Sequence, residues 1–463
     1  MQNQIGATQK LAHFTAGITY DKLSDTSRTM AKKCILDWLG VAIRGSQEKP
    51  AQILRGVVTA DAGASNQATV LDGHQWHKST VLNAAMCNGA ASHTLDFDDL
   101  HNPSIIHLAT VVVPPAMALA QANHKSGREL IAAVCAGYEA GARVGEAVIP
   151  ESYFYWHTTG TAGTFGAAAA AANILSLSPE ETLMCYGSAG SQAAGLWEFL
   201  KEGAMSKALH AGKASYAGVL AALLSKAGFT GASTILEGEK GFCHAMVREP
   251  HLEKLTEGLG SGKLKIDENS FKPYACCKHS HAALYAIQRL RGEHKLHADN
   301  INSIDILVND ITDYLINNPA PQNAYGCKFS IQYCAAAMLQ YGQVGIDQFT
   351  DAAINDPATR SLMNKITVTR DPKMEAIHKA DASRLASAVN ITCADGKQLT
   401  MQVDYPKGDP ECPMTWEDLA AKFISLTSPV CGAKMAAKLC SMIENLEKQN
   451  DVDAALLSCL KED

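Results

Sequence analysis

The sequence predicts a mainly α protein, with a large all-α domain and a smaller α+β domain. Helical periodicity, with few strand signals, dominates the chain up to about residue 226. After about Gly262 the pattern changes, and β-branched residues alternate with polar ones. The chain has 463 residues, 47% hydrophobic and 19% charged, which is typical of a globular protein of two or three domains.

The N-terminal half is expected to be a succession of helices. Apolar repeats between residues 8 and 45 indicate helix, with Gly40 and Gly45 near its end. Loops are expected from about residue 227 to 242. Further helices are predicted at 49–60, 79–93, 114–124, 127–148, 163–175, 179–192 and 205–226.

A glycine-rich run, Gly160 to Gly166, interrupts this helical half. Its spacing is GxxGxxG rather than GxGxxG, and no strand precedes it, so a dinucleotide-binding loop is disfavoured. Small residues continue to Ala172, which favours close helix–helix packing.

The smaller domain is expected to contain strands at 301–308, 366–369 and 388–393. Asp395-Gly396 predicts a hairpin between 389–393 and 399–403. Thr415 is a plausible N-cap of a following helix, with Asp418 in the capping-box position. Composition places the boundaries at 1–265 for the helical domain and 266–405 for the α+β domain, with helices in 406–463 returning to the helical domain.

The stretch from Ala91 to Ala116 is the richest in chemistry, because three acids and three histidines lie close together in it. Asp96, Asp98 and Asp99 follow a predicted helix C-terminus, where the helix dipole disfavours negative charge. Such a misfit suggests a working site. The alternative is a helix-ending loop whose charged groups are solvated.

Three further groups could contribute to a site. His157 ends an aromatic run and could instead be a packed core histidine. Lys207 and His210, three residues apart on a predicted helix, could bind an anion or lie on an exposed face. Cys277, between Lys272 and Lys278, could be a nucleophile or a buried inert thiol.

Metal and nucleic-acid binding are disfavoured. Asp96, Asp99, His101 and His107 offer suitable ligand atoms but match neither HExxH nor an EF-hand loop. No CxxC pair suggests structural zinc, and a net charge of −7 argues against a broad nucleic-acid surface. No apolar run of 18 residues predicts a membrane span. Neither a secretory signal nor a disulfide framework is expected, so a cytoplasmic setting is predicted.

The clustered acids, lysines and histidines suit proton transfer beside carboxylates, with lysines offsetting charge in an enolate-like transition state.

Several motifs of the chain resemble the MmgE/PrpD family, which includes 2-methylcitrate dehydratases, cis-aconitate decarboxylases and iminodisuccinate epimerases. The motifs span most of the chain. They are Asn88-Gly89 with HTLDFDD at 93–99, His157 with 163–170, KALHAG at 207–212, GFTG at 228–231 with Gly238 and Gly241-Phe242, and 272–281.

The resemblance implies a homodimer whose subunits have a helical domain, an α+β lid and an active site between them. It also implies no metal or organic cofactor, as in the decarboxylase and epimerase branches of the family. By motif, the implied site residues are Asp96, His107, His157, Lys207, Lys272 and Tyr314. The short loop 100–106 and the run YACC at 274–277 are similar to fungal cis-aconitate decarboxylase. Leu100 and Cys277 differ from the Thr and His that the animal decarboxylases have at these places.

The resulting hypothesis is a cofactor-independent lyase acting on a small di- or tricarboxylate by decarboxylation or dehydration. Lys207, Lys272 and His157 would hold carboxylates, while Asp96 and His107 would position the substrate or move a proton. Asp98, Asp99 and His101 would brace the loop. An epimerase of an iminodisuccinate-like compound and a catalytically silent metabolite-binding protein are the alternatives.

Overall fold

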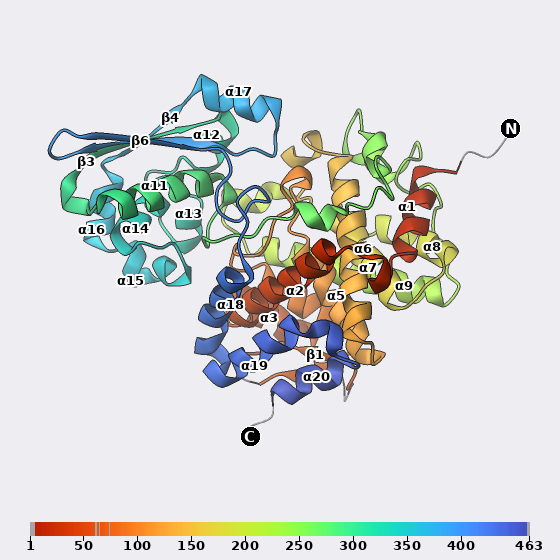
Figure 1. The fold of residues 1–463 in the computed structure, drawn as a ribbon. Coiled ribbons are helices and arrows are strands. Elements are labelled where there is room, and N and C mark those ends of the chain that lie inside the picture. The colour runs from red at the N-terminus through yellow and green to blue at the C-terminus, as the bar shows by residue number, and fades with distance from the viewer. Residues whose placement is uncertain (1–4, 61–62, 64, 74, 461–463) are drawn as a thin grey trace. The chain divides into compact units, whose positions relative to one another are not determined.

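A computed structural model describes residues 5–60, 63, 65–73 and 75–460. The chain forms two compact units (Figure 1). The helical unit contains the described residues of Met1–Thr94, Asp98–Asn269 and Thr415–Asp463. The sheet unit contains Leu95–Phe97 and Ser270–Met414. Most described elements are helices, so the prediction of a mainly α protein is confirmed.

In its described residues, the helical unit is built from helices and one small antiparallel pair of strands. The strands, β1 (Ala68–Val70) and β2 (His77–Ser79), were not predicted, because three residues are too few to show a periodic pattern. The helices are α1 (Ala7–Ala16), α2 (Asp25–Gly45), α3 (Lys49–Val58), α4 (Val81–Ser92), α5 (Ala109–Ala122), α6 (Gly127–Glu146), α7 (Gly163–Ile174), α8 (Pro179–Gly190), α9 (Ser206–Lys226), α10 (Phe242–Met246), α18 (Trp416–Cys431), α19 (Ala433–Glu444) and α20 (Val452–Cys459).

Small residues let the central helices approach closely. Helix α7 packs against α5, α6 and α9 (Figure 1). A Cβ placed on Gly137 of α6 would lie 2.9 Å from the Gly166 carbonyl oxygen of α7, so only glycine fits there. The glycine-rich run therefore serves close helix packing, as predicted.

Helix α5 begins at Ala109, five residues before the predicted start at Pro114. Two distant side chains support this first turn. Asp99 Oδ1 accepts the Ala109 amide at 3.0 Å. The Thr110 carbonyl, whose usual helical donor would be the missing N–H of Pro114, accepts the Ser215 hydroxyl at 3.3 Å. The prediction was wrong because these partners come from other segments.

The C-terminal helices pack on the N-terminal ones. Helix α18 lies against α2, and α20 contacts α5. Lys422 of α18 forms a buried ion pair of 2.6 Å with Asp37 of α2. The expected capping box is confirmed, because Thr415 accepts the Asp418 amide at 3.2 Å and Asp418 accepts the Thr415 amide at 3.0 Å.

The sheet unit contains a four-stranded mixed sheet in the order β4-β3-β5-β6. Its strands are β3 (Ile301–Val308), β4 (Ile366–Arg370), β5 (Ser387–Cys393) and β6 (Gln398–Val403). β3 pairs parallel with β4 and antiparallel with β5. β5 and β6 form the predicted hairpin, with Thr392 opposite Gln398.

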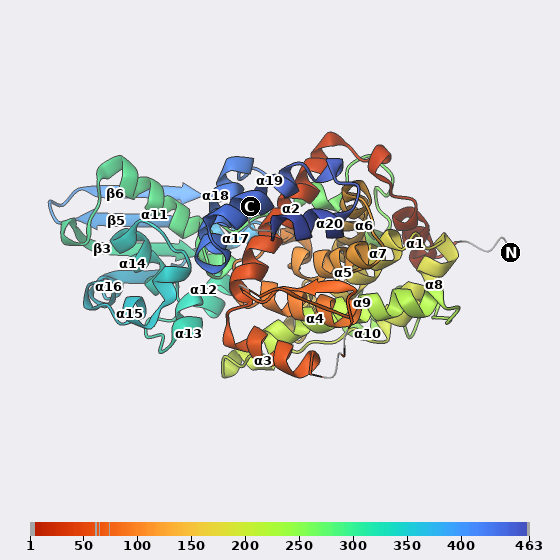
Figure 2. The ribbon, with the colours of Figure 1, turned by 90° about the horizontal axis from the view of Figure 1, so that it is seen from below.

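Helices cover this sheet. α11 packs on β5 and β6, α14 contacts β4 and α17 contacts β3. Figure 2 shows β3, β5 and β6 side by side, with α11 and α14 next to them. The helices are α11 (His281–His294), α12 (Asp310–Ile316), α13 (Ala324–Lys328), α14 (Ile331–Tyr341), α15 (Asp351–Ile354), α16 (Pro357–Met363) and α17 (Pro372–Ala380). Across the described parts of both units, no helix combines the length and apolar character needed to cross a bilayer.

Candidate active site

A cluster of imidazoles lies inside the helical unit. We call it the histidine cluster: His93, Asp98, His107, His157, Lys207 and His210. His93 caps the C-terminus of α4, and His107 comes two residues before α5. His157 precedes α7, where its amide donates to the Gly195 carbonyl at 3.0 Å. Lys207 and His210 lie in the first turns of α9.

Asp98 holds two of these imidazoles with one oxygen. Its Oδ2 lies 2.7 Å from Nδ1 of His93 and 3.2 Å from Nδ1 of His107. The side chains of Asp98 and His93 are fully buried. Burying a carboxylate without partners would cost roughly several kcal/mol of folding free energy. The two imidazoles are the partners that accommodate the charge of Asp98.

The remaining rings continue the cluster. The rings of His93 and His157 stack, with centroids 5.3 Å apart and planes 14° apart. Nδ1 of His157 lies 3.1 Å from Nδ1 of His210, so one of the two rings donates to the other. The indole of Trp197, in the 3₁₀ turn Trp197–Lys201, lies 4.6 Å from the His157 ring. His157 is therefore both a packed histidine and a member of the cluster.

Burial keeps three of these imidazoles, His93, His157 and His210, neutral. It lowers the pKa of His93 to about 4 against the opposing charge of Asp98. It also lowers the pKa of His157 well below its usual value, and the charge of Lys207 adds to this shift. The pKa of His210 falls to about 4 through burial and the charges of Lys213 and Lys207. Neutral imidazoles can accept a proton or a hydrogen bond.

Asp98, unlike His93, is held in its charged form. Burial raises the pKa of Asp98, but the interactions of its carboxylate with His107 and His93 outweigh burial and hold this pKa well below the usual value. The carboxylate therefore stays ionised at neutral pH.

Lys207 is the cation of the cluster. It is only 8% exposed although it lies in the first turn of α9, where the helix dipole disfavours positive charge. Its charge acts on His93, His157 and His210. The alternative of a solvated face is thus wrong for Lys207. A buried lysine among neutral imidazoles is suited to binding a carboxylate.

An open cavity of about 550 Å³ reaches this cluster through His210. Trp156, Leu196, Phe199 and Leu209 form part of its apolar lining, and Lys213 adds a cation. The cavity thus connects a site-forming imidazole to the surface of the helical unit.

The sheet unit holds a second group of candidates around the segment Leu95–Phe97. Asp96 has a positive φ of 55°, a conformation that costs energy in a non-glycine residue. Lys272 is 2% exposed, and its Nζ lies 3.1 Å from the Asp96 carbonyl oxygen and 3.3 Å from Asp96 Oδ1. Lys328 donates to the Leu95 carbonyl. Two lysines therefore hold this segment in its strained conformation.

The charge of Asp96 acts on Cys277 and on Tyr325. Burial raises the pKa of the Cys277 thiol to about 12, and the charge of Asp96 adds to this, so the nucleophile hypothesis is disfavoured. The Tyr325 hydroxyl is buried and has no hydrogen-bond partner within the described part of the chain. Burial and the charge of Asp96 raise the pKa of Tyr325, which leaves a neutral phenol able to donate a hydrogen bond.

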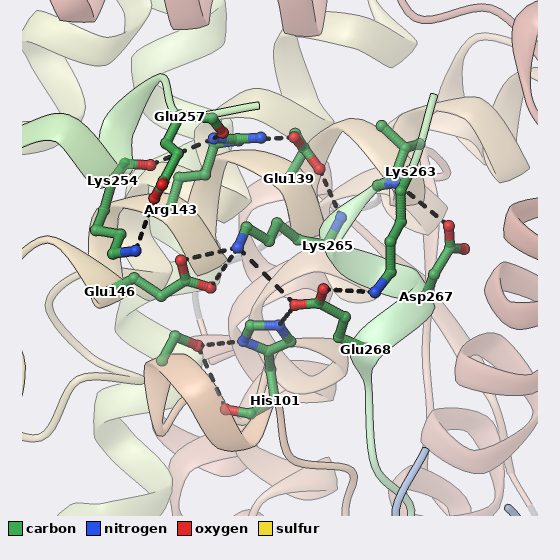
Figure 3. Close-up of polar contacts among 12 residues, drawn as sticks. His101, Glu139, Arg143, Glu146, Lys254, Glu257, Lys263, Lys265, Asp267 and Glu268 are labelled. Carbon is green, nitrogen blue, oxygen red and sulfur yellow. Dashed lines mark hydrogen bonds and ion pairs between the residues drawn. The ribbon is translucent and has the colours of Figure 1, made fainter. Parts of the chain in front are cut away.

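Asp99 and His101 have structural partners. Asp99 Oδ2 accepts the Tyr138 hydroxyl at 2.5 Å, and His101 Nδ1 lies 2.8 Å from the Ser104 hydroxyl. His101 Nε2 is 3.8 Å from Glu268 Oε2 in a network that also contains Glu146 and Lys265 (Figure 3). These contacts agree with the expectation that both residues brace the loop.

Two groups of side chains offer metal-ligand geometry among the described residues: His93 with Asp98 and His107, and His101 with Glu146 and Glu268. Neither is the set considered from the sequence. In the second group, the Lys265 ammonium lies 2.8 Å from Glu146, so a cation of the chain already neutralises it (Figure 3). In the first group, Asp98 is shared between two imidazoles, and Lys207 adds positive charge.

Of the implied site residues, His107, His157 and Lys207 belong to the histidine cluster, and Asp96 and Lys272 contact each other in the sheet unit. Tyr314, on α12, is 78% exposed. Sequence reasoning missed the roles of His93 and Asp98, although HTLDFDD contains both, and it missed Tyr325, which no motif marks.

Known proteins are similar to this chain over most of its length. Cis-aconitate decarboxylase-like protein oryM of Aspergillus oryzae (strain ATCC 42149 / RIB 40) is 28% identical, over 81% of this chain and 81% of its own. Human cis-aconitate decarboxylase is 27% identical over 96% of this chain and 92% of its own. That of Aspergillus terreus is 26% identical over 98% and 96%. The MmgE/PrpD N-terminal domain matches residues 9–255 and the C-terminal domain matches residues 274–448. The chain therefore belongs to the MmgE/PrpD family.

Proposed function

We propose that the protein is a cofactor-independent lyase that removes carbon dioxide or water from a small di- or tricarboxylate. The main support is the buried Lys207 beside the neutral imidazoles of His93, His157 and His210. A substrate carboxylate at this cation would be held where little water competes with it. Cis-aconitate is the first substrate to test, because the relatives compared include cis-aconitate decarboxylases.

In this proposal, Lys207 and His157 hold substrate carboxylates. Decarboxylation leaves the bonding electron pair on carbon, and a nearby carboxylate conjugated to that carbon carries part of the charge. Fixed cations stabilise that charge in a water-poor site. His107, 12% exposed and beside the ionised Asp98, delivers or removes the proton.

We also propose that turnover requires Asp96, Lys272 and Tyr314. The contact between Lys272 and Asp96 supports the first two, since an ammonium that contacts the carbonyl and the carboxylate of Asp96 has a third hydrogen to donate. Family resemblance supports Tyr314. Tyr314→Phe and Tyr325→Phe each remove one hydroxyl, so their separate effects on kcat would show which phenol the reaction uses.

Incubation with cis-aconitate, 2-methylcitrate, citrate and iminodisuccinate, followed by NMR in deuterated water, tests the reaction type. Loss of carbon dioxide or of water would support a lyase. Deuterium exchange without net loss would identify an epimerase instead. Binding of these compounds without any turnover would indicate a metabolite-binding protein and contradict the proposal.

Lys207→Met tests the observation that carries the proposal. It should lower kcat/KM by about 30-fold or more, because truncating one partner of a buried charge pair costs roughly 2–5 kcal/mol. Lys226→Met, at the exposed end of the same helix, is the matched control and should leave kcat/KM unchanged. Equal activity of the two variants would contradict the assignment of Lys207.

We further propose that the protein is a homodimer, as the family resemblance implies. Exposed apolar side chains of the helical unit support this proposal. Leu196 and Leu209 line the cavity, and Phe154, Tyr155 and Met205 are within two residues in sequence of the lining residues Trp156 and Ser206.

A further inference from the structure

One carboxylate lies beneath two imidazoles of the histidine cluster. Asp98 and His93 are both fully buried, and Nδ1 of His93 lies 2.7 Å from Asp98 Oδ2. Nδ1 of His107 lies 3.2 Å from the same oxygen. Both rings therefore turn the same nitrogen, Nδ1, toward Asp98.

This orientation determines where the ring protons are. An ionised carboxylate can only accept hydrogen bonds, so the nitrogen facing it must carry the hydrogen. His93 is neutral, and its proton is therefore on Nδ1. Its Nε2 is left as an acceptor, and this atom is buried without a hydrogen-bond partner in the part of the chain that the structure describes.

Asp98 keeps acceptor capacity for His107. The 3.2 Å contact to His107 has ion-pair distance without hydrogen-bond alignment, and Asp98 Oδ1 has no hydrogen-bond partner among the described side chains. A positive charge on His107 would strengthen this contact, because a charge-assisted hydrogen bond is about twice as strong as a neutral one.

The titratable groups around Asp98 come from several elements. His93 comes from the end of α4, and His107 from the loop before α5. The charge of Lys207, on α9, acts on His93, and the ring of His157, before α7, stacks on the His93 ring. Asp99, the next residue, adds a second acidic group. Asp98 is thus the carboxylate that contacts both His93 and His107.

We propose that Asp98 is the positioning residue of this site, which fixes His93 and His107 with Nδ1 protonated and leaves Nε2 of both for proton transfer or ligand binding. Its catalytic consequence rests on the proposed function. When Nε2 of His107 gains a proton from a substrate carbon or a water, the ring becomes an imidazolium, Nδ1 keeps its hydrogen and Asp98 stays ionised. The same proton then leaves Nε2 for the product.

The tautomer itself can be measured without any substrate. In protein labelled with ¹⁵N-histidine, the NMR signals of His93 and His107 should show a protonated Nδ1 at a pH where the rings are neutral. Single His→Gln variants assign the signals. Asp98→Ala should move the proton of His93 at least partly to Nε2, and Asp98→Asn, which keeps the side-chain volume, should weaken the preference. A wild-type signal with Nε2 protonated, or unchanged signals in both variants, would overturn the proposal.

Kinetics then test the catalytic role. Asp98→Asn should lower kcat by about 10²- to 10⁴-fold, as loss of a histidine-orienting carboxylate does in hydrolases, while KM changes less than about threefold. Asp99→Asn is the matched control and should keep kcat, because Asp99 contacts Tyr138 and the Ala109 amide instead.

The two proposals can fail separately. If the wild type turns over none of the four carboxylates, the proposed function fails, while the NMR result still decides the tautomers. If the tautomers are as expected but Asp98→Asn has wild-type kcat, the positioning role is overturned and the lyase assignment stands.

Discussion

Asp98 and Asp99 are neighbours in the chain, both fully buried, yet their surroundings drive their ionisation in opposite directions. Asp98 faces two imidazoles, which hold its pKa well below the usual value. Burial raises the pKa of Asp99 to about 8, and the negative charges of Asp98 and Asp37 act in the same direction. The hydrogen bond from Tyr138 acts in the opposite direction. Asp98 is thus held as a charged carboxylate, whereas Asp99 tends to keep a proton beside the Tyr138 hydroxyl.

The raised pKa of Asp99 predicts a stability that falls as pH rises. The folded protein keeps this proton up to a pH of about 8, whereas the unfolded chain releases it near the ordinary value of 3.8. Between these values the folded state binds more protons, so the free energy of unfolding falls by up to about 1.4 kcal/mol per pH unit. Asp99→Asn cannot ionise and should lack this loss.

Urea denaturation of the wild type and Asp99→Asn at several pH values from 5 to 8 measures the difference. The wild type should lose stability relative to the variant as pH increases. Parallel curves for the two proteins would show that Asp99 is ionised in the folded state across this range.

At the scale of elements, the contact between α6 and α7 depends on glycine. A Cβ on Gly137 would lie 2.5 Å from Val112 Cγ1 and 2.9 Å from the Gly166 carbonyl oxygen. Gly137→Ala should therefore lower the free energy of unfolding by about 1–3 kcal/mol through overpacking. Gly56→Ala in α3, where a Cβ meets nothing within 4 Å, should instead raise it by about 0.5–1 kcal/mol. Thermal denaturation of both variants checks the two signs, and a stabilised Gly137→Ala would contradict the packing argument.

Local signals made several elements predictable. Asp395-Gly396 specifies a turn by its own backbone preferences, and Thr415 with Asp418 caps a helix within four residues. The start of α5 depends instead on Asp99 and Ser215, which are distant in sequence. Periodicity cannot reveal such partners, so the predicted start was wrong by five residues. The expected domain boundaries stay a prediction.

The candidate site was partly visible for the same reason. HTLDFDD concentrates acids and histidines in one stretch, so it drew attention to Asp96 and His107. The contact of Asp98 with His93 depends on how the chain turns after α4, and the stacking of His93 on His157 joins two distant segments. Tyr325 became a candidate only through the burial of its unpartnered hydroxyl.

At the scale of the molecule, the face of the helical unit that holds the open cavity exposes apolar side chains. Leu196 and Leu209 are 54% and 44% exposed, and both line the cavity that His210 reaches. The rings of Phe154 and Tyr155 pack edge to face. These two residues directly precede Trp156, which also lines the cavity. Exposed apolar patches of this kind commonly mark protein–protein contacts.

The homodimer proposal predicts that this face is covered by a second copy. Light scattering during size-exclusion chromatography should give twice the chain mass of 49.3 kDa. Leu209→Glu should weaken association at least about tenfold, since a charge buried without a partner in an interface costs more than roughly 1.4 kcal/mol. Leu457→Glu, on α20 and 37% exposed, is the control and should stay dimeric. A monomeric wild type would refute the homodimer, whereas a dimeric Leu209→Glu variant would mean that the copies associate through another face.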